Sequence, residues 1–157
     1  MTHRALIAAA CLIWTGGAFA QGMQVSQNGD REGYIGPDDY FTGTAYVEPL
    51  FSAGDSFRSN GASVTFLPGA RSHWHTHPAG QVLIVTEGTG WVQAEDGEKR
   101  IMRPGDVIRT PPGVKHWHGA TDTNAVTHLA IQQLKNGENV IWKEPVTDRQ
   151  YNGGAAE

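Results

Sequence analysis

The chain has 157 residues and a formal net charge of −4, with 12 basic residues against 16 acidic ones. Its length suits one domain, and the absence of a Lys/Arg cluster argues against nucleic acid or an anionic membrane as a partner. Six of the seven histidines lie between His73 and His128. The groups best suited to metal binding or proton transfer are therefore concentrated in one stretch.

Residues 1–20 have the features of a secretory signal peptide. Arg4 precedes the apolar run Ala5–Gly17, and Ala18-Phe19-Ala20 has the small-x-small form of a cleavage site. A membrane anchor is the alternative, but the run is shorter than the roughly 20 residues that span a bilayer. We therefore expect a periplasmic or secreted protein with no membrane association after cleavage. Cleavage would leave 137 of the 157 residues and remove the chain's single cysteine, Cys11, so that no disulfide is possible.

The rest of the chain divides into an arm, a barrel and a tail. Residues 21–39 are polar and Gly-rich, which predicts an extended N-terminal arm. Residues 40–144 contain short alternating or apolar runs separated by turn residues, as expected of a barrel. The predicted strands are Thr44–Leu50, Ala62–Leu67, His73–His77, Val82–Glu87, Trp91–Glu95, Lys99–Arg103, Val107–Thr110, Val126–Gln132 and Asn139–Trp142.

Turn chemistry supports this strand assignment. Asp96-Gly97, between two of the runs, predicts a two-residue hairpin, and Pro78-Ala79-Gly80 predicts a tight turn. A helical turn is predicted only within Val146–Tyr151, and residues 145–157 are expected to form a C-terminal turn and flexible tail. The sequence therefore predicts a single all-β domain, a barrel or jelly roll.

Three histidines at alternate positions precede the turn at residues 78–80. Side chains alternate along a strand, so His75 and His77 project from the same face. The amide of Gln81 arrives directly after the turn, and His116 follows Pro111-Pro112-Gly113 further along. Imidazole and amide groups gathered in this way predict a site for a first-row metal ion.

Two spaced motifs resemble those of the cupin superfamily. The first consists of Gly69, His75, His77, Gln81 and Gly88, and the second of Gly105, Pro111, Gly113 and His116. The resemblance implies a single cupin domain, a double-stranded β-helix or jelly-roll barrel with the metal in its mouth. Two positions depart from the usual pattern, because Gln81 replaces a common glutamate ligand and Ala120 replaces a common asparagine.

A narrower resemblance covers most of residues 40–151. Segments such as Trp74–Gln81, His116–Ala120 and Thr127–Gln132 are similar to the bacterial cupin-type (R)-hydroxynitrile lyases, the (R)-mandelonitrile lyase group. This resemblance implies a divalent ion, usually Mn²⁺, with Fe²⁺ as the alternative. It also implies the following residues: His75, His77, Gln81 and His116 as ligands; His118, His128 and Gln132 as catalytic residues; and Ala62 and Val64 as part of the pocket.

The chemistry of the ligand set agrees with this reading. Three neutral imidazoles and a neutral amide leave a divalent ion with its full formal charge, which favours binding of alkoxide or cyanide. Alternation along Val126–Gln132 places His128, Ala130 and Gln132 on one face, within reach of a substrate if that face is the interior. With the resemblance, this chemistry implies a lyase that cleaves a cyanohydrin into an aldehyde and hydrogen cyanide, with His128 as the expected base and His118 or Gln132 as donors to cyanide. We also expect a homodimer or homotetramer.

Alternatives remain open at this stage. A cupin dioxygenase that uses iron would share this frame, as would an exported protein that binds a small ligand or metal without catalysis. Oxygen consumption separates the dioxygenase from the lyase. His73 is expected to flank the site rather than to bind the metal, and His118 has a cap of a loop as its alternative role. The four tryptophans Trp74, Trp91, Trp117 and Trp142 are expected to be packing aromatics, and Trp117 is the one among them most expected to touch the pocket.

Overall fold

The computed structural model describes residues 22–54 and 57–153. The predicted signal peptide at residues 1–20 and most of the predicted tail lie outside these ranges. Within the described residues, no helix has the length and apolar character needed to cross a bilayer.

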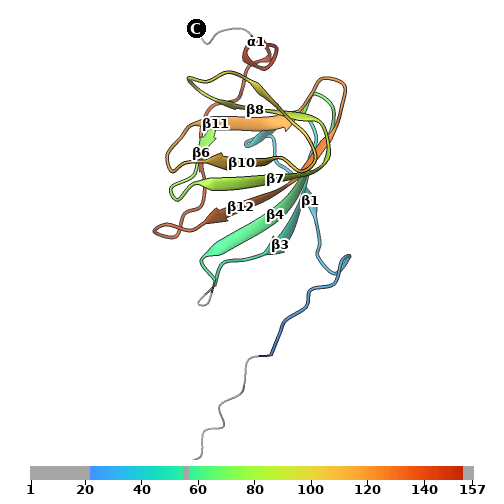
Figure 1. Cartoon of the computed structure of the whole chain (residues 1–157), viewed down its shortest axis with the longest axis vertical. Coiled ribbons are helices and arrows are strands. Elements are labelled where there is room, and N and C mark those ends of the chain that lie inside the picture. The colour runs from blue at the N-terminus through green and yellow to red at the C-terminus, as the bar shows by residue number, and fades with distance from the viewer. Residues whose placement is uncertain (1–21, 55–56, 154–157) are drawn as a thin grey trace, which may run out of the picture.

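Two antiparallel sheets curl around one interior (Figure 1). The first sheet has the order β1-β3-β4-β12-β7-β10 and the second the order β13-β6-β11-β5-β2, with β8 paired to β11 and β9 paired to β8. The strands are β1 (Tyr34–Ile35), β2 (Phe41–Thr42), β3 (Ala45–Phe51), β4 (Ser59–Phe66), β5 (Arg71–Ser72), β6 (His75–Thr76), β7 (Gln81–Gly88), β8 (Gly90–Ala94), β9 (Arg100–Met102), β10 (Val107–Thr110), β11 (His116–Ala120), β12 (Val126–Gln133) and β13 (Ile141–Trp142).

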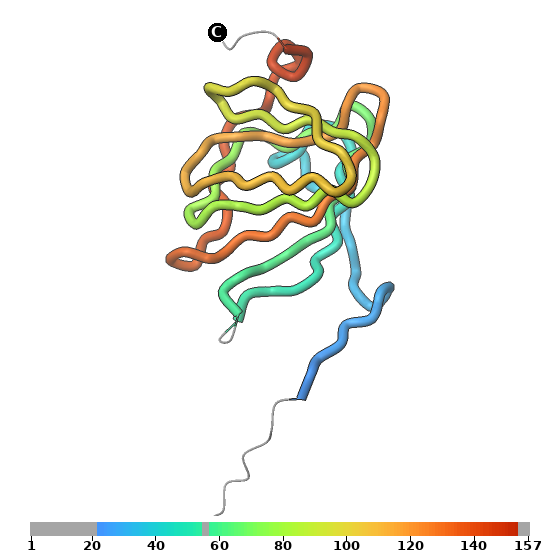
Figure 2. Tube along the Cα trace, viewed as in Figure 1, coloured from blue at the N-terminus to red at the C-terminus, as the bar shows by residue number. Residues whose placement is uncertain are grey.

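The barrel forms because the strands alternate between buried and less buried residues. In β7 the inward side chains are Gln81, Leu83 and Val85, and in β12 they are Val126, His128 and Ala130. These inward positions join Phe66, Met102 and other apolar residues in one interior cluster. The predicted all-β barrel is confirmed, and its apolar cluster leaves one end of the interior to polar side chains. Residues 22–33 run away from the barrel as an arm (Figure 2).

The prediction of one continuous strand over His73–His77 is wrong, because the strand is interrupted there. The chain forms β5 and β6 on either side of His73 and Trp74, and both short strands pair with β11. The backbone of Trp74 bonds instead with the C-terminal segment, donating to Glu144 O and accepting from Lys143 N. A distant segment therefore competes for the hydrogen bonds that a continuous strand would have used.

The connection between β8 and β9 also differs from the predicted two-residue hairpin. The last paired residues are Val92 and Arg100, so the link is longer than Asp96-Gly97. Gly97 N donates to Ala94 O in a turn, but the φ angle of Gly97 is not positive. A two-residue type I′ turn requires positive φ at both central residues, and this turn does not meet that requirement.

Strand β11 was not among the predicted strands, although it supplies His116 and His118. Its five residues, His-Trp-His-Gly-Ala, are all buried and show no polar–apolar alternation. Gly119 lies so close to β5 that an added Cβ would stand 2.5 Å from Ala70 O and 2.6 Å from Arg71 Cα. This close contact holds β11 against the segment that carries His75.

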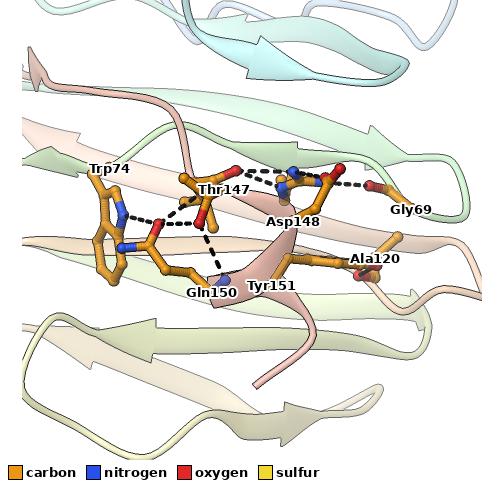
Figure 3. A network of polar contacts seen from close by, with 9 residues as sticks. Gly69, Trp74, Ala120, Thr147, Asp148, Gln150 and Tyr151 are labelled. Atoms are coloured by element: carbon orange, nitrogen blue, oxygen red, sulfur yellow. Dashed lines mark hydrogen bonds and ion pairs between the residues drawn. The ribbon is translucent and has the colours of Figure 1, made fainter. Parts of the chain in front are cut away.

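The C-terminal segment packs on the outer face of the second sheet. Its short helix α1 (Asp148–Tyr151) falls within the predicted helical turn and begins with a capping box between Thr147 and Gln150. Tyr151 packs with Trp74, Trp117 and Val146 in a second apolar cluster outside the barrel. Figure 3 shows the polar contacts around the helix, including the bond from Tyr151 Oη to Ala120 O at 3.0 Å.

Arg71 fastens this segment to the barrel. Its Nε and Nη2 donate to Val146 O at 3.1 and 2.9 Å, and Nη2 also pairs with Asp148 Oδ1 at 2.7 Å. Its guanidinium carbon lies 4.6 Å from the centre of the Tyr151 ring, a cation–π contact. Because Arg71 is buried while Asp148 is 88% exposed, the bonds to Val146 matter more than the ion pair.

We predict that Arg71→Met lowers the free energy of unfolding by about 2–4 kcal/mol, because Val146 O is left without donors in a buried position. Asp148→Asn, which removes only an exposed charge, should cost less than about 1 kcal/mol. Urea unfolding of both variants measures the difference. Equal losses would show that the ion pair, and not the bonds to the carbonyl, holds the segment.

Candidate metal centre and substrate cavity

Three elements bring four histidines together at the polar end of the barrel. His75 lies on β6, His77 follows it at the start of the turn, and His116 and His118 lie on β11. His75 and His116 are directly paired across β6 and β11, and their ring centres stand 4.3 Å apart. The two sequence motifs therefore meet through strand pairing.

A backbone carbonyl orients each of three rings. Nδ1 of His75 lies 2.9 Å from His73 O, Nδ1 of His116 lies 2.9 Å from Val114 O, and Nδ1 of His77 lies 2.5 Å from Asn139 O. A carbonyl oxygen only accepts hydrogen bonds, so each Nδ1 carries the hydrogen and each Nε2 keeps its lone pair. Metal-binding histidines are held in this way.

The turn at residues 78–80 sets Gln81 beside these rings. His77 O accepts from Gly80 N at 3.1 Å and from Gly113 N at 3.0 Å, which joins the two motifs through one carbonyl. Gly80 has φ of 83°, and a Cβ there would lie 2.8 Å from Thr110 O. The predicted tight turn is confirmed, and it depends on a glycine at its end.

These residues fit a divalent ion. Gln81 Oε1 lies 3.1 Å from His116 Nε2, and both atoms are acceptors when His116 carries its hydrogen on Nδ1. Adjacent ligands on an octahedral first-row ion stand roughly 3 Å apart. An ion bound between these two atoms would accept both lone pairs, which otherwise face each other. The Nε2 atom of His77 is also buried and has no hydrogen-bond partner among the described residues.

One group of three histidines contains His118 in place of His77 of the predicted ligand set. Ring nitrogens of His75, His116 and His118 lie within 4.8 Å of one another, an arrangement that could hold a metal ion. His118 directs its Nδ1 to His128 Nε2 at 3.1 Å, however, and His77 has an unused nitrogen. His73 contributes its carbonyl to His75, which is the flanking position expected from the sequence.

Burial keeps the histidines neutral. It lowers the pKa of His75 well below the ordinary value, with the neighbouring His116 adding to the effect, and it lowers the pKa of His116 to about 4. Burial also lowers the pKa of His77, although its bond to Asn139 opposes the shift. Neutral imidazoles keep their lone pairs for a metal at pH 7.

A cavity of about 370 Å³ opens onto this centre. Its polar lining includes His75, His77, Gln81, His118 and Gln132, together with Ser52, Asn60 and Asn139. The remaining lining is largely apolar or aromatic and includes Tyr40, Phe41, Val47, Ala62, Val64, Ala130 and Trp142. A pocket with an apolar wall and a few convergent polar groups is the usual form of a small-molecule site, and Ala62 and Val64 lie in it as expected.

His128 does not line the cavity. Its side chain is fully buried behind His118, and the two ring centres are 4.7 Å apart. Burial lowers the pKa of His128 to about 4. Burial, and secondly the charge of His128, lower the pKa of His118 well below its ordinary value. His118 and Gln132 reach the cavity directly, whereas His128 reaches it only through His118.

Trp117 is a packing residue, as expected of the tryptophans, but the expectation that it touches the pocket is wrong. Trp117 is fully buried in the outer cluster under α1, because it lies between His116 and His118 and so faces the other side of β11. Trp142 lines the cavity instead, with its ring 4.9 Å from that of His75. The pairing of β13 with β6 brings it there, and no local pattern signals that pairing.

The sequence of the chain is similar to those of known cupin proteins, which agrees with a metal site of this kind. Residues 62–131 match the cupin domain family. The chain is 54% identical over 129 residues to the (R)-mandelonitrile lyase of Granulicella tundricola, a match that covers 82% of this chain and 98% of that protein. The chain belongs to the cupin family.

Within the cupins, the chain groups with that lyase over most of its length. A cupin-like protein from Thermotoga maritima is 37% identical, with a TM-score of 0.75, and the match covers 83% of this chain and 98% of that one. A gentisate 1,2-dioxygenase from Ralstonia is 38% identical over 68 residues, which are 43% of this chain but only 19% of that enzyme. The dioxygenase similarity is thus confined to part of the barrel.

We predict that acid destabilises the protein through His128. Its pKa is about 4 when folded and near 6.5 when unfolded, so between these values the unfolded chain binds more protons. Stability is therefore full above about pH 6.5 and is lost as pH falls towards 4, by about 2 kcal/mol between pH 7 and pH 5 for this residue. Urea unfolding at both pH values should show a smaller loss for His128→Leu, and an equal loss would contradict the assignment.

Proposed function

We propose that the protein is a metal-dependent lyase that cleaves a cyanohydrin into an aldehyde and hydrogen cyanide, and catalyses the reverse addition. The observation that carries the proposal is a group of neutral histidines that could hold a metal ion, at the end of a largely apolar cavity. Similarity over most of the chain to an (R)-mandelonitrile lyase supports the same conclusion. Mandelonitrile and related aryl cyanohydrins are the substrates that we propose.

We further propose His75, His77, Gln81 and His116 as the residues that hold the ion, with Mn²⁺ as the resident metal and Fe²⁺ as the alternative. The three oriented histidines and the amide oxygen of Gln81 support this set. An ion held there supplies a Lewis acid that lowers the pKa of a cyanohydrin hydroxyl. The neutral ligands leave its positive charge undiminished.

The residues around the cavity provide the remaining chemistry. His118 lines the cavity, is neutral, and has Nε2 available because Nδ1 contacts His128. We assign it to accept the hydroxyl proton while the carbon–cyanide bond breaks and cyanide leaves with the electron pair. We assign Gln132, which lines the cavity, to donate its amide N–H to the departing cyanide. The proton held by His118 then passes to cyanide and completes hydrogen cyanide.

His128 acts through His118 in this scheme. The ring contact fixes the orientation of His118, and it places an acceptor or donor behind it. Because burial lowers the pKa values of both His118 and His128, the pair stays unprotonated in mildly acidic solution. We therefore assign His128 to position the base, His118.

An iron-dependent dioxygenase is the second candidate. The similarity to gentisate 1,2-dioxygenase favours it, although the match covers 19% of that enzyme. The neutral ligand set argues modestly against it, because a ferric state is harder to reach at a centre without a carboxylate. A protein that only binds a ligand or metal would use the same cavity without turnover.

We predict that the metal content follows the proposed ligand set. His75→Ala or His116→Ala should reduce the metal from about one ion per chain to near zero, since each removes a ligand nitrogen. His73→Ala should leave the content nearly unchanged, because His73 supplies only a backbone carbonyl. Metal analysis of the purified variants measures this. Loss of metal in His118→Ala with retention in His77→Ala would place the ion in the alternative histidine group.

We predict that the manganese-loaded protein releases benzaldehyde from mandelonitrile at mildly acidic pH without oxygen, and stops when the metal is removed. His118→Ala should slow turnover by about 10²–10⁴-fold, the usual range for a lost acid–base group, with its metal retained. His128→Ala should also slow turnover with its metal retained, because His118 loses the ring contact that orients it.

Benzaldehyde release followed in an anaerobic chamber, with an oxygen electrode on parallel samples, separates the candidates. Oxygen consumption with gentisate-like aromatic substrates and no release from mandelonitrile would transfer the assignment to the dioxygenase. Unchanged turnover in His118→Ala would refute the proposed base.

A further inference from the structure

Three amide side chains form a row along the cavity wall. Gln81 on β7, Gln132 on β12 and Asn60 on β4 all line the cavity. The strand register places Gln81 opposite Gln132 and Gln132 opposite Asn60. The row therefore crosses three adjacent strands and leads away from the metal centre, with Asn60 at its far end.

The amide of Asn60 differs from the other two in its hydrogen bonds. Gln81 Oε1 faces His116, and Gln81 Nε2 donates to Gln132 Oε1 at 3.5 Å. The Oδ1 atom of Asn60 is buried and has no partner among the described residues. A buried acceptor without a donor costs about 1–3 kcal/mol. Such an atom in a cavity wall marks a place where a ligand can supply the missing donor.

An aromatic wall forms another part of the same cavity. The rings of Tyr40 and Trp142 are stacked, with centres 4.7 Å apart and planes at 14°, and Trp142 also contacts His75. On the first sheet the paired residues Ala62 and Ala130 have small side chains. Small residues on one sheet and stacked aromatic rings on the other leave a space that suits a flat ring.

We propose that Asn60 is a substrate-recognition residue that accepts a hydrogen bond from a hydroxyl group on the ring of the substrate. The substrate class is then a hydroxylated aromatic aldehyde and its cyanohydrin. The reacting carbon lies at the histidines, the ring lies along Trp142, and the ring hydroxyl meets Asn60 Oδ1. This inference rests on the proposed function for the identity of the reacting group.

The distance between the two ends suits such a molecule. Neighbouring strands lie about 4.8 Å apart, so the backbones of Gln81 and Asn60 are separated by roughly 10 Å. Both side chains line the cavity, and a hydroxylated benzaldehyde spans a comparable distance once the hydrogen bonds at its two ends are counted. A methoxy group at the same ring position fills similar space but has no hydrogen to donate.

Equilibrium binding to the manganese-loaded protein without cyanide tests the proposal, since no turnover is then possible. Isothermal titration should use benzaldehyde, 3- and 4-hydroxybenzaldehyde, and the matching methoxybenzaldehydes. At least one hydroxyl isomer should bind about tenfold more tightly than benzaldehyde and than its methoxy analogue, the effect of one added hydrogen bond. Equal affinities for all five aldehydes, or a preference for a methoxy compound, would overturn the proposal.

Variants of Asn60 locate the effect. Asn60→Leu, of similar shape but without the amide, should abolish the preference for the hydroxyl isomer, whereas Asn60→Asp keeps an acceptor and should retain it. Gln133→Leu is the matched control, because Gln133 follows Gln132 on β12 but is exposed on the other face. Retention of the preference in Asn60→Leu, or its loss in Gln133→Leu, would refute the role of Asn60.

The outcome is distinguishable from that of the lyase proposal. Hydroxyl-selective binding through Asn60 without benzaldehyde release from mandelonitrile would refute the lyase and leave the subsite. Benzaldehyde release without selectivity for a ring hydroxyl would refute the subsite and leave the lyase.

Discussion

The structure of the site depends on one repeated interaction, the hydrogen bond from a histidine Nδ1 to a backbone carbonyl. His75, His77 and His116 each make it, to carbonyls from three different parts of the chain. Each bond fixes the tautomer and directs Nε2 towards the centre. Without these bonds the rings could rotate or exchange tautomers, and the facing lone pairs of His116 and Gln81 would have no fixed geometry for an ion.

Burial without nearby carboxylates gives the site its second property. The histidines are held neutral by desolvation, and no acidic residue lines the cavity among the residues that the structure describes. A divalent ion in that setting keeps its charge, while His118 remains able to accept a proton. The same low polarity suits the aromatic substrate that we propose. The proposed metal binding, proton transfer and substrate binding would therefore share one physical cause.

The C-terminal segment connects the outer face of the barrel to this centre. It places Asn139 O against His77 and Trp142 against His75, and it then bonds with Trp74 before Arg71 fastens it near α1. A segment far from the motifs in sequence thus completes both a ligand orientation and a cavity wall. Packing on the outside of the sheet supports the geometry inside the barrel.

Local pattern was sufficient for most of the strands, the turn at residues 78–80 and the residues gathered at the centre. Alternation, glycine at positive φ and the spacing of the motifs all act over a few residues, so they can be read from the sequence. The break at His73 and Trp74, the strand β11 and the role of Trp142 depended on contacts with remote segments. So did the burial of His128 behind His118 and the unpartnered oxygen of Asn60. These features were decided by tertiary structure, because hydrogen-bond partners and burial depend on what packs against a residue and not on its neighbours in sequence.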